Sequence, residues 1–232
     1  MVGVCGGLAN LDDHTKHVRY GDVIISKADH TSQAIYYFVS SIQRSSTAGT
    51  RCSFQTKSWV SSDSILTDVV DKLKKKPKRL LKKLDVYLKE GVKELEECVE
   101  MSFHRPLPAT NEEESDTMMA KSGSANELRI NLPLIHYGTV ASGKIINKDA
   151  AVRDEFCSVN DTKAIDTGFQ AVLDSVEGNC KHSFIIIRGV ADYIDGTKNK
   201  EWQPYAALTA AAAMKIIILE LIASNDDDDD DI

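Results

Sequence analysis

The chain has 232 residues, of which 42% are hydrophobic and 27% are charged, a composition typical of one soluble domain with a sizeable core. Its formal net charge of −7 argues against a general nucleic-acid binder or an acidic-membrane binder, because both need clustered cations. The five cysteines form no Cys-x-x-Cys or Cys/His pattern, and no run of apolar residues is long enough for a membrane span. We therefore expect a cytoplasmic protein without a disulfide framework, metal or cofactor.

Three short apolar runs near the start of the chain predict strands. Residues 1–7 read as a buried strand that runs into a glycine turn, and residues 21–26 and 35–39 read as two more strands. Nothing before residue 1 could pair with the first strand or cover it. We therefore expect that the start of the domain is missing and that this strand leaves an uncovered sheet edge.

Residues 61–100 change to helical periodicity and predict two helices, separated near Pro77. Their basic run, 72–83, reads as a solvated helix face, with nucleic-acid binding as the alternative. Residues 104–127 contain prolines, an acidic run and few apolar anchors, so we expect an exposed loop there.

After this loop, strands and helices alternate. The strands are expected at 134–141, 163–167 and 183–190, and the helices at 149–156, 169–176 and 203–223. This order predicts an α/β fold with a largely parallel sheet and helices on both sides. Residues 1–224 are expected to form one domain, followed by a disordered acidic tail at 225–232.

Three segments resemble the nucleoside phosphorylase and nucleosidase family, in particular its divergent eukaryotic branch. They are GVCGG (3–7) with GDVIIS (21–26), IHYGTVASG (135–143) with the residues up to 154, and IRGVADY (187–193) with the residues up to 207. The resemblance covers nearly the whole chain and is loosest over 56–128. It implies a three-layer sandwich with a largely parallel mixed sheet, a homo-oligomer, and a purine nucleoside or base as ligand.

The resemblance implies that Asp192 is the catalytic acid. Cleavage of a purine N-glycosidic bond leaves an oxocarbenium-like sugar and an electron-rich base, so protonation of a ring nitrogen of the base lowers the barrier. Asp192 follows an apolar strand at the carboxyl edge of the expected sheet, where α/β folds bind ligands, and burial would keep it protonated. Without the resemblance, an aspartate in this position reads as a helix cap.

On the sugar side, the Glu-Met-Glu-like segment of the family reads Asp166, Thr167 and Gly168 here. The position that binds the ribose hydroxyls in the family is Gly168, which has no side chain. Charge-assisted hydrogen bonds contribute about 1.5–3 kcal/mol each, so losing this carboxylate would weaken transition-state binding. Asp166 could replace it only if the strand were shifted in register.

The resemblance also places six weaker positions at the ligand: Cys5, Gly6, Gly7, Ser142, Gly143 and Ile146. The Cys5-to-Gly7 backbone would approach the sugar or base, although a Gly-Gly pair also reads simply as a turn. Ile146 stands where nucleosidases often have a stacking phenylalanine, so an aliphatic contact would replace aromatic stacking.

The expected function is cleavage of purine nucleosides, with water or phosphate as the acceptor, impaired by Gly168 and by the missing start. The choice of acceptor stays open, because the deciding residues would precede residue 1. The alternative is a catalytically inactive module that binds a purine or a protein partner, and a third possibility is a truncated product without a function of its own.

Because Gly168 offers no side chain to the sugar, free adenine should bind nearly as tightly as methylthioadenosine. Calorimetric titration of the two ligands measures this ratio. A nucleoside that binds at least tenfold more tightly, a gap of about 1.4 kcal/mol, would contradict the prediction and make Asp166 the first residue to examine.

Overall fold

The computed structural model describes residues 1–9, 17–28, 34–44, 52–107, 132–166, 168–179, 183–194 and 199–226. The strands are β1 (Val2–Gly7), β2 (Val23–Ser26), β3 (Tyr36–Arg44), β4 (Cys52–Trp59), β5 (Ile135–Ser142), β6 (Thr162–Ile165) and β7 (Ile187–Tyr193). The helices are α1 (Ile65–Lys74), α2 (Pro77–Glu96), α5 (Lys144–Lys148), α6 (Ala150–Val159), α7 (Gln170–Gly178) and α8 (Trp202–Asp226). Most of the expected loop at 104–127 lies outside the described residues, as do residues 227–232 of the expected tail.

The strands form one mixed sheet that closes on itself. β1–β7, β2–β5, β3–β5 and β5–β6 are parallel pairs, whereas β1–β6, β2–β7 and β3–β4 are antiparallel. Because β2 pairs with both β7 and β5, the strands β2, β7, β1, β6 and β5 complete a ring, to which β3 and β4 are attached. Pairing along both edges of β2 satisfies the backbone groups that an open sheet would leave exposed.

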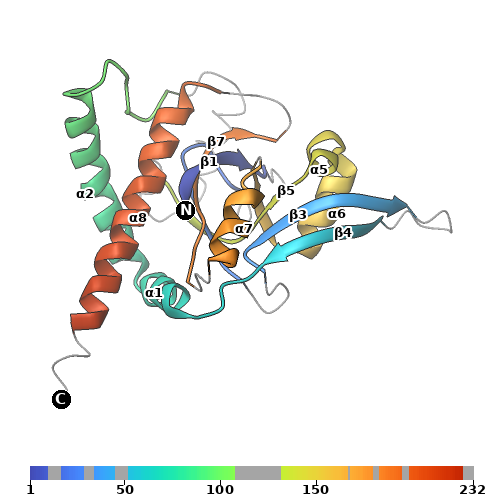
Figure 1. The fold of residues 1–232 in the computed structure, drawn as a ribbon. Helices are drawn as coiled ribbons and strands as arrows, with labels where there is room; N and C mark the ends of the chain where they lie inside the picture. The colour runs from blue at the N-terminus through green and yellow to red at the C-terminus, as the bar shows by residue number, and fades with distance from the viewer. Residues whose placement is uncertain are drawn as a thin grey trace.

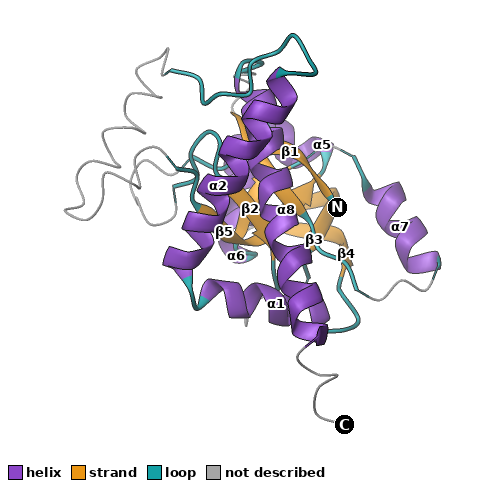
Figure 2. Ribbon diagram, turned by 90° about the vertical axis from the view of Figure 1, so that its left-hand side faces the viewer, coloured by secondary structure: helices purple, strands orange, loops and turns teal. Residues whose placement is uncertain are grey.

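Helices lie on two sides of this sheet. Figure 2 shows α1, α2 and α8 in front of the strands, and Figure 1 shows α5 and α6 on the other side, beside β3 and β4. The expectation of an α/β fold with a mixed sheet is thus confirmed. The expected three-layer sandwich is corrected, because its middle layer is a closed ring of strands rather than an open sheet.

The expected uncovered edge at the first strand is also corrected. β1 has β7 along one edge and β6 along the other, with Gly3 opposite Arg188 and Gly6 opposite Ile165. The strand that pairs on one side only, within the described part of the chain, is β4. β4 was not among the predicted strands, although Trp59 at its end and Tyr36, its partner on β3, are both buried.

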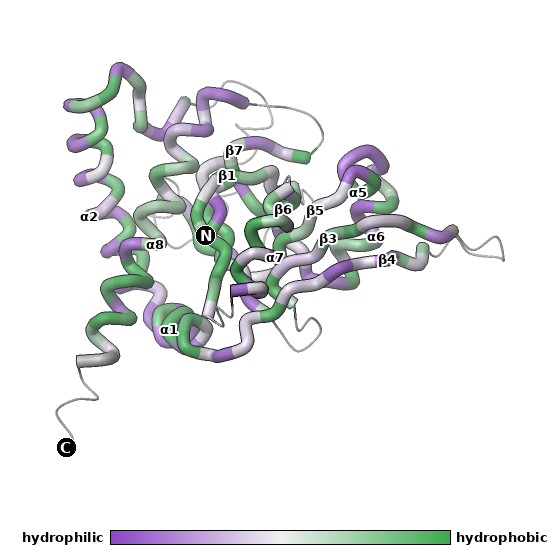
Figure 3. The backbone as a smooth tube through the Cα atoms, viewed as in Figure 1, coloured by the Kyte–Doolittle hydropathy of each residue, from purple (hydrophilic) through white to green (hydrophobic). Residues whose placement is uncertain are grey.

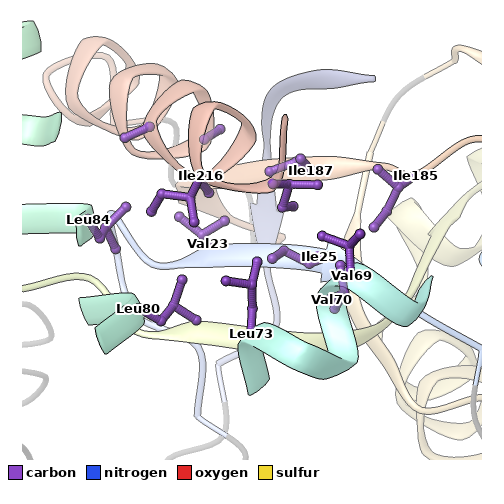
Figure 4. Packing of buried hydrophobic residues seen from close by; sticks show 14 of the residues in the cluster. Val23, Ile25, Val69, Val70, Leu73, Leu80, Leu84, Ile185, Ile187 and Ile216 are labelled. Atoms are coloured by element: carbon purple, nitrogen blue, oxygen red, sulfur yellow. The ribbon is translucent and has the colours of Figure 1, made fainter. Parts of the chain in front are cut away.

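The main core lies between the helices α1, α2 and α8 and the strands β2 and β7 (Figure 4). Helical spacing gives α1 and α2 one apolar face each, and Pro77 starts α2 at a position where its missing N–H costs nothing. The buried residues labelled in this core are Val23, Ile25, Val69, Val70, Leu73, Leu80, Leu84, Ile185, Ile187 and Ile216.

Helix α8 packs against β7, β1 and α2. It is mostly hydrophobic along its length (Figure 3), with alanines in its first half and larger apolar residues after them. The small alanines let the helix approach the sheet closely. An added Cβ at Gly189 would lie 1.8 Å from the Ala206 carbonyl oxygen, so the contact with β7 requires glycine. By length and composition, Trp202–Ser224 would also suffice to cross a membrane, but 44% of its apolar stretch is buried in this fold. The helix continues through Asn225 and Asp226, two residues of the expected tail.

The pairing of β2 with β5 closes the ring, and the buried carboxylate of Asp22 links the starts of these two strands. It accepts hydrogen bonds from the backbone and side chain of Arg19 at 3.0 Å, and from the Leu134 backbone N–H at 2.8 Å. Its Oδ2 also lies 2.9 Å from Nε2 of His136 on β5. Burial alone would raise the pKa of Asp22, but the Arg19 guanidinium and His136 hold it well below its usual range.

The ionised form of Asp22 therefore stabilises the fold above the unfolded-state pKa of about 4, and this contribution is lost as the pH falls through the lowered folded-state value. Asp22→Asn should lower the free energy of unfolding at pH 7 by about 3 kcal/mol, because the buried Arg19 guanidinium loses the negative charge that pairs with it. Urea unfolding at several pH values measures this, and the gap to the parent should narrow below pH 4.

The matched control is Asp85→Asn, which removes a carboxylate paired with the exposed Lys89 at 2.7 Å. Its cost should stay below about 0.5 kcal/mol. Equal losses for the Asp22 and Asp85 variants at pH 7 would contradict the bracing role of Asp22.

Candidate functional site

Three strand ends meet around one cavity of about 310 Å³. β1 and β7 run parallel, so their carboxyl ends lie together. β6 runs antiparallel to β1, and its last residue, Ile165, pairs with Gly6. The volume falls at the small end of the range for ligand cavities, about 300–1,000 Å³. The described residues that line it are Val4, Cys5, Gly6, Asn147, Ile165, Asp166, Asp192, Tyr193, Ile194 and Gln203.

Asp192 reaches the cavity from β7, next to Gly6 of β1. The two residues are partners in the strand pairing, at a register shift between Cys5 and Gly6. A Cβ added at Gly6 would lie 3.0 Å from Oδ1 of Asp192 and 3.1 Å from the Ile194 side chain. The glycine thus leaves the space that the Asp192 carboxyl group occupies, which links two residues that the sequence had singled out separately.

Asp166 lies at the same cavity and is held by a buried ion pair. Its Oδ2 accepts a hydrogen bond of 2.6 Å from Nε of Arg188, and the two side chains are 14% and 7% exposed. Arg188 also stacks over the ring of Phe169 at 4.4 Å and donates to the Met1 carbonyl oxygen at 3.4 Å. Asp166 therefore lines the cavity with one of its carboxylate oxygens bound to Arg188.

Cys5 is buried between these charged groups. Burial raises the pKa of its thiol well above the ordinary value, and the Asp166 and Asp192 carboxylates add to the rise, while Arg188 opposes it. The thiol therefore stays neutral at pH 7 and contributes a small apolar wall to the cavity.

The residues expected on the base side are buried near the cavity rather than along it. Ser142 is 2% exposed, and its Oγ accepts a hydrogen bond of 2.6 Å from the hydroxyl of Tyr36. A Cβ at Gly143 would lie 2.4 Å from the Val39 carbonyl oxygen, so this glycine serves backbone packing. Ile146 is fully buried in a core cluster with Phe156. None of the three is among the described lining residues.

Gly7 and Gly168 also lie outside the described lining. A Cβ at Gly7 would meet the Val190 side chain at 2.7 Å, so this glycine lets β1 pack closely against β7. Gly168 has a φ of +71°, in the left-handed region that favours glycine, and an added Cβ would meet no other atom. The backbone conformation, rather than a lack of space, therefore accounts for glycine at this position. Thr167 lies outside the described residues.

Asn147, Gln203 and Arg188 were not among the residues predicted for the site. Asn147 and Gln203 carry the amides that line the cavity. Their positions on α5 and at the start of α8 give no signal in the sequence. Arg188 could have been found, because a charge inside the apolar run 184–190 requires a buried partner. In the described part of the chain, no three His, Cys, Asp or Glu side chains lie together as metal ligands would.

No protein-family model matches the chain. Over 79 residues, or 34% of this chain, the sequence is 32% identical to a nucleotide-binding leucine-rich repeat (NLR)-like protein of Hyaloscypha variabilis, and the chain spans only 7% of that protein. Among solved structures it is similar to a protein of Francisella philomiragia described as a 5′-methylthioadenosine/S-adenosylhomocysteine nucleosidase, at 15% identity and a TM-score of 0.42. That match covers 96% of this chain and 67% of the other.

A uridine phosphorylase of the oomycete Phytophthora capsici is also similar, at 12% identity and a TM-score of 0.47, over 96% of this chain and 65% of the other. With identity this low, function has to be inferred from the residues that line the cavity.

The ion pair between Arg188 and Asp166 should dominate the stability of the site. Arg188→Met should lower the free energy of unfolding by about 3–5 kcal/mol, because the buried Asp166 carboxylate loses the positive charge of Arg188. The double variant with Asp166→Asn should recover at least about 1 kcal/mol of that loss, since the negative charge that Arg188 balanced is gone. Chemical unfolding of the single and double variants measures the coupling, and strictly additive losses would contradict it.

Proposed function

We propose that this cavity binds the base of a purine nucleoside and that Asp192 donates a proton to the base during slow cleavage of the N-glycosidic bond. The observation that carries the proposal is the meeting of Asp192, Gly6 and Asp166 at one cavity. These residues come from three separate segments, and the resemblance read from the sequence assigned each of them to the same ligand.

The reaction requires a general acid near the base and a pocket that holds the base. The bond between C1′ of the sugar and the ring nitrogen breaks, its electrons go to the base, and the Asp192 proton goes to a ring nitrogen of that base. Water or phosphate adds to C1′. The apolar walls from Val4, Ile165 and Ile194 suit the faces of a planar base.

The sugar side supports only slow turnover. The Asp166 carboxylate has one oxygen bound to Arg188, and Gly168 stands outside the described lining. Hydrogen bonds that strengthen as the sugar becomes oxocarbenium-like would therefore be few. This same observation favours the alternative function, a module that binds a purine without cleaving it.

Release of free base separates the two functions. The protein should release base from methylthioadenosine, adenosine or inosine at less than about 1 per second. Asp192→Asn should lower this rate at least a hundredfold, because general acid catalysis contributes about 10²–10⁴. Chromatography of the base, with and without phosphate, measures both rates.

The control is Asp154→Asn on the exposed surface of α6, where the carboxylate is 73% exposed. It should release base at the parent rate. Equal rates for the parent and the Asp192 variant would show that Asp192 is not the acid. Binding of adenine without any release of base by the parent would favour the non-cleaving module.

A further inference from the structure

Asn147 has a polar atom without a hydrogen-bond partner in the described part of the chain. It lies on α5, is half-buried and lines the cavity. Its Oδ1 is buried, and no group in the described part of the chain donates a hydrogen bond to it. Leaving a buried acceptor unsatisfied costs about 1–3 kcal/mol, and native proteins tolerate such atoms mainly where a ligand or function requires them.

The position of Asn147 is fixed by its neighbours. Its backbone N–H donates to the Gly143 carbonyl at 3.2 Å, and the preceding residue, Ile146, is fully buried in the core. Gly143 is in turn packed against the Val39 carbonyl. The amide is therefore carried to the cavity by a short helix that is held by Ile146 in the core and by Gly143 against β3, and a specificity-determining side chain needs such support.

The cavity is rich in hydrogen-bond acceptors. Four described lining residues end in an amide or carboxyl group: Asn147, Asp166, Asp192 and Gln203. No lysine or arginine is among the described lining residues. Each of these groups has an acceptor oxygen, and that of Asn147 lacks a donor in the described structure, whereas the bare purine ring presents mostly acceptor nitrogens.

We propose that Asn147 is a specificity-determining residue whose Oδ1 accepts a hydrogen bond from the exocyclic amino group of an aminopurine. The inference rests on the proposed function, because it assumes that the cavity holds a purine base. The inference extends the proposed function in two ways: it names the preferred ligands, aminopurines over unsubstituted purines, and the residue that selects them. The ligand's amino N–H supplies the donor that Oδ1 lacks in the described structure.

The informative comparison removes the amino group rather than replacing it with a carbonyl. A carbonyl oxygen could be accommodated by turning the amide of Asn147 so that Nδ2 donates instead. Purine, which carries hydrogen in place of the amino group, offers Asn147 neither a donor nor an acceptor there. Adenine and 2-aminopurine carry the amino group at different ring positions and report which edge faces Asn147.

Calorimetric or fluorescence titration of the full chain with adenine, 2-aminopurine and purine tests the proposal. The parent should bind at least one of the aminopurines about fivefold to tenfold more tightly than purine, the size of one buried neutral hydrogen bond. Asn147→Leu, of nearly equal size, should reduce this ratio to about one while leaving purine affinity within about twofold. Asn147→Asp keeps an acceptor oxygen and should retain the preference.

The matched control is Gln203→Leu, which removes an exposed amide from the mouth of the same cavity. It should change the affinities for aminopurine and purine by the same factor. Thermal melting accompanies each titration, and Asn147→Leu should melt no lower than the parent, because it removes an unsatisfied buried acceptor.

Three results would overturn the proposal. A parent that binds the aminopurines and purine equally has no amino-group selection. A preference that persists in Asn147→Leu belongs to another residue. If none of the three bases binds the parent, the proposed function fails, and the role of Asn147 fails with it; the first two results leave the purine site intact.

Discussion

The buried ion pair between Arg188 and Asp166 is the interaction on which the geometry of the site depends. Arg188 lies on β7 and Asp166 follows β6, and these two strands flank β1 on opposite sides. Arg188 is opposite Gly3 of β1 in the strand pairing, and a Cβ added at Gly3 would lie 3.3 Å from a guanidinium nitrogen of Arg188. The arginine thus passes over a glycine in β1 to reach its partner. Two strands and their loops are fixed to each other at the edge of the cavity.

Closure of the sheet supplies the second constraint. Asp22 binds Arg19, Leu134 and His136, and so holds the start of β2 against the start of β5. This seam completes the ring whose other strands, β7, β1 and β6, provide most of the cavity wall. The two buried carboxylates therefore act at different places. Asp22 holds the ring closed, and Asp166 with Arg188 holds the strand ends together around the cavity.

Much of the fold follows from patterns that the sequence shows directly. The apolar runs that became β1, β2, β5 and β7 are continuous because both their faces are covered, and the spacing of leucines predicted α1 and α2. Closure of the sheet could not be predicted, because it depends on which edges β2 shares and not on its composition. β4 was missed because an exposed strand carries few apolar residues.

The sequence led to part of the candidate site, and it failed where packing decides which residues face the cavity. The motif around Asp192 led to the cavity, as did Cys5, Gly6 and Asp166. Ser142, Gly143 and Ile146 fell inside the core instead, because the turn between β5 and α5 packs their side of the chain against β3 and α6. Asn147, on α5 directly after the buried Ile146, lines the cavity instead, and no sequence pattern specifies this difference.

A crystal structure of the protein soaked with adenine tests most directly whether the strand ends of β1, β6 and β7 form a purine site, as we propose. We expect density for a planar base in contact with Asp192 and with the walls formed by Val4 and Ile165. We also expect that Asp166 remains bound to Arg188 in that complex. Density for adenine elsewhere on the protein, with this cavity filled by solvent alone, would contradict a purine site at these strand ends.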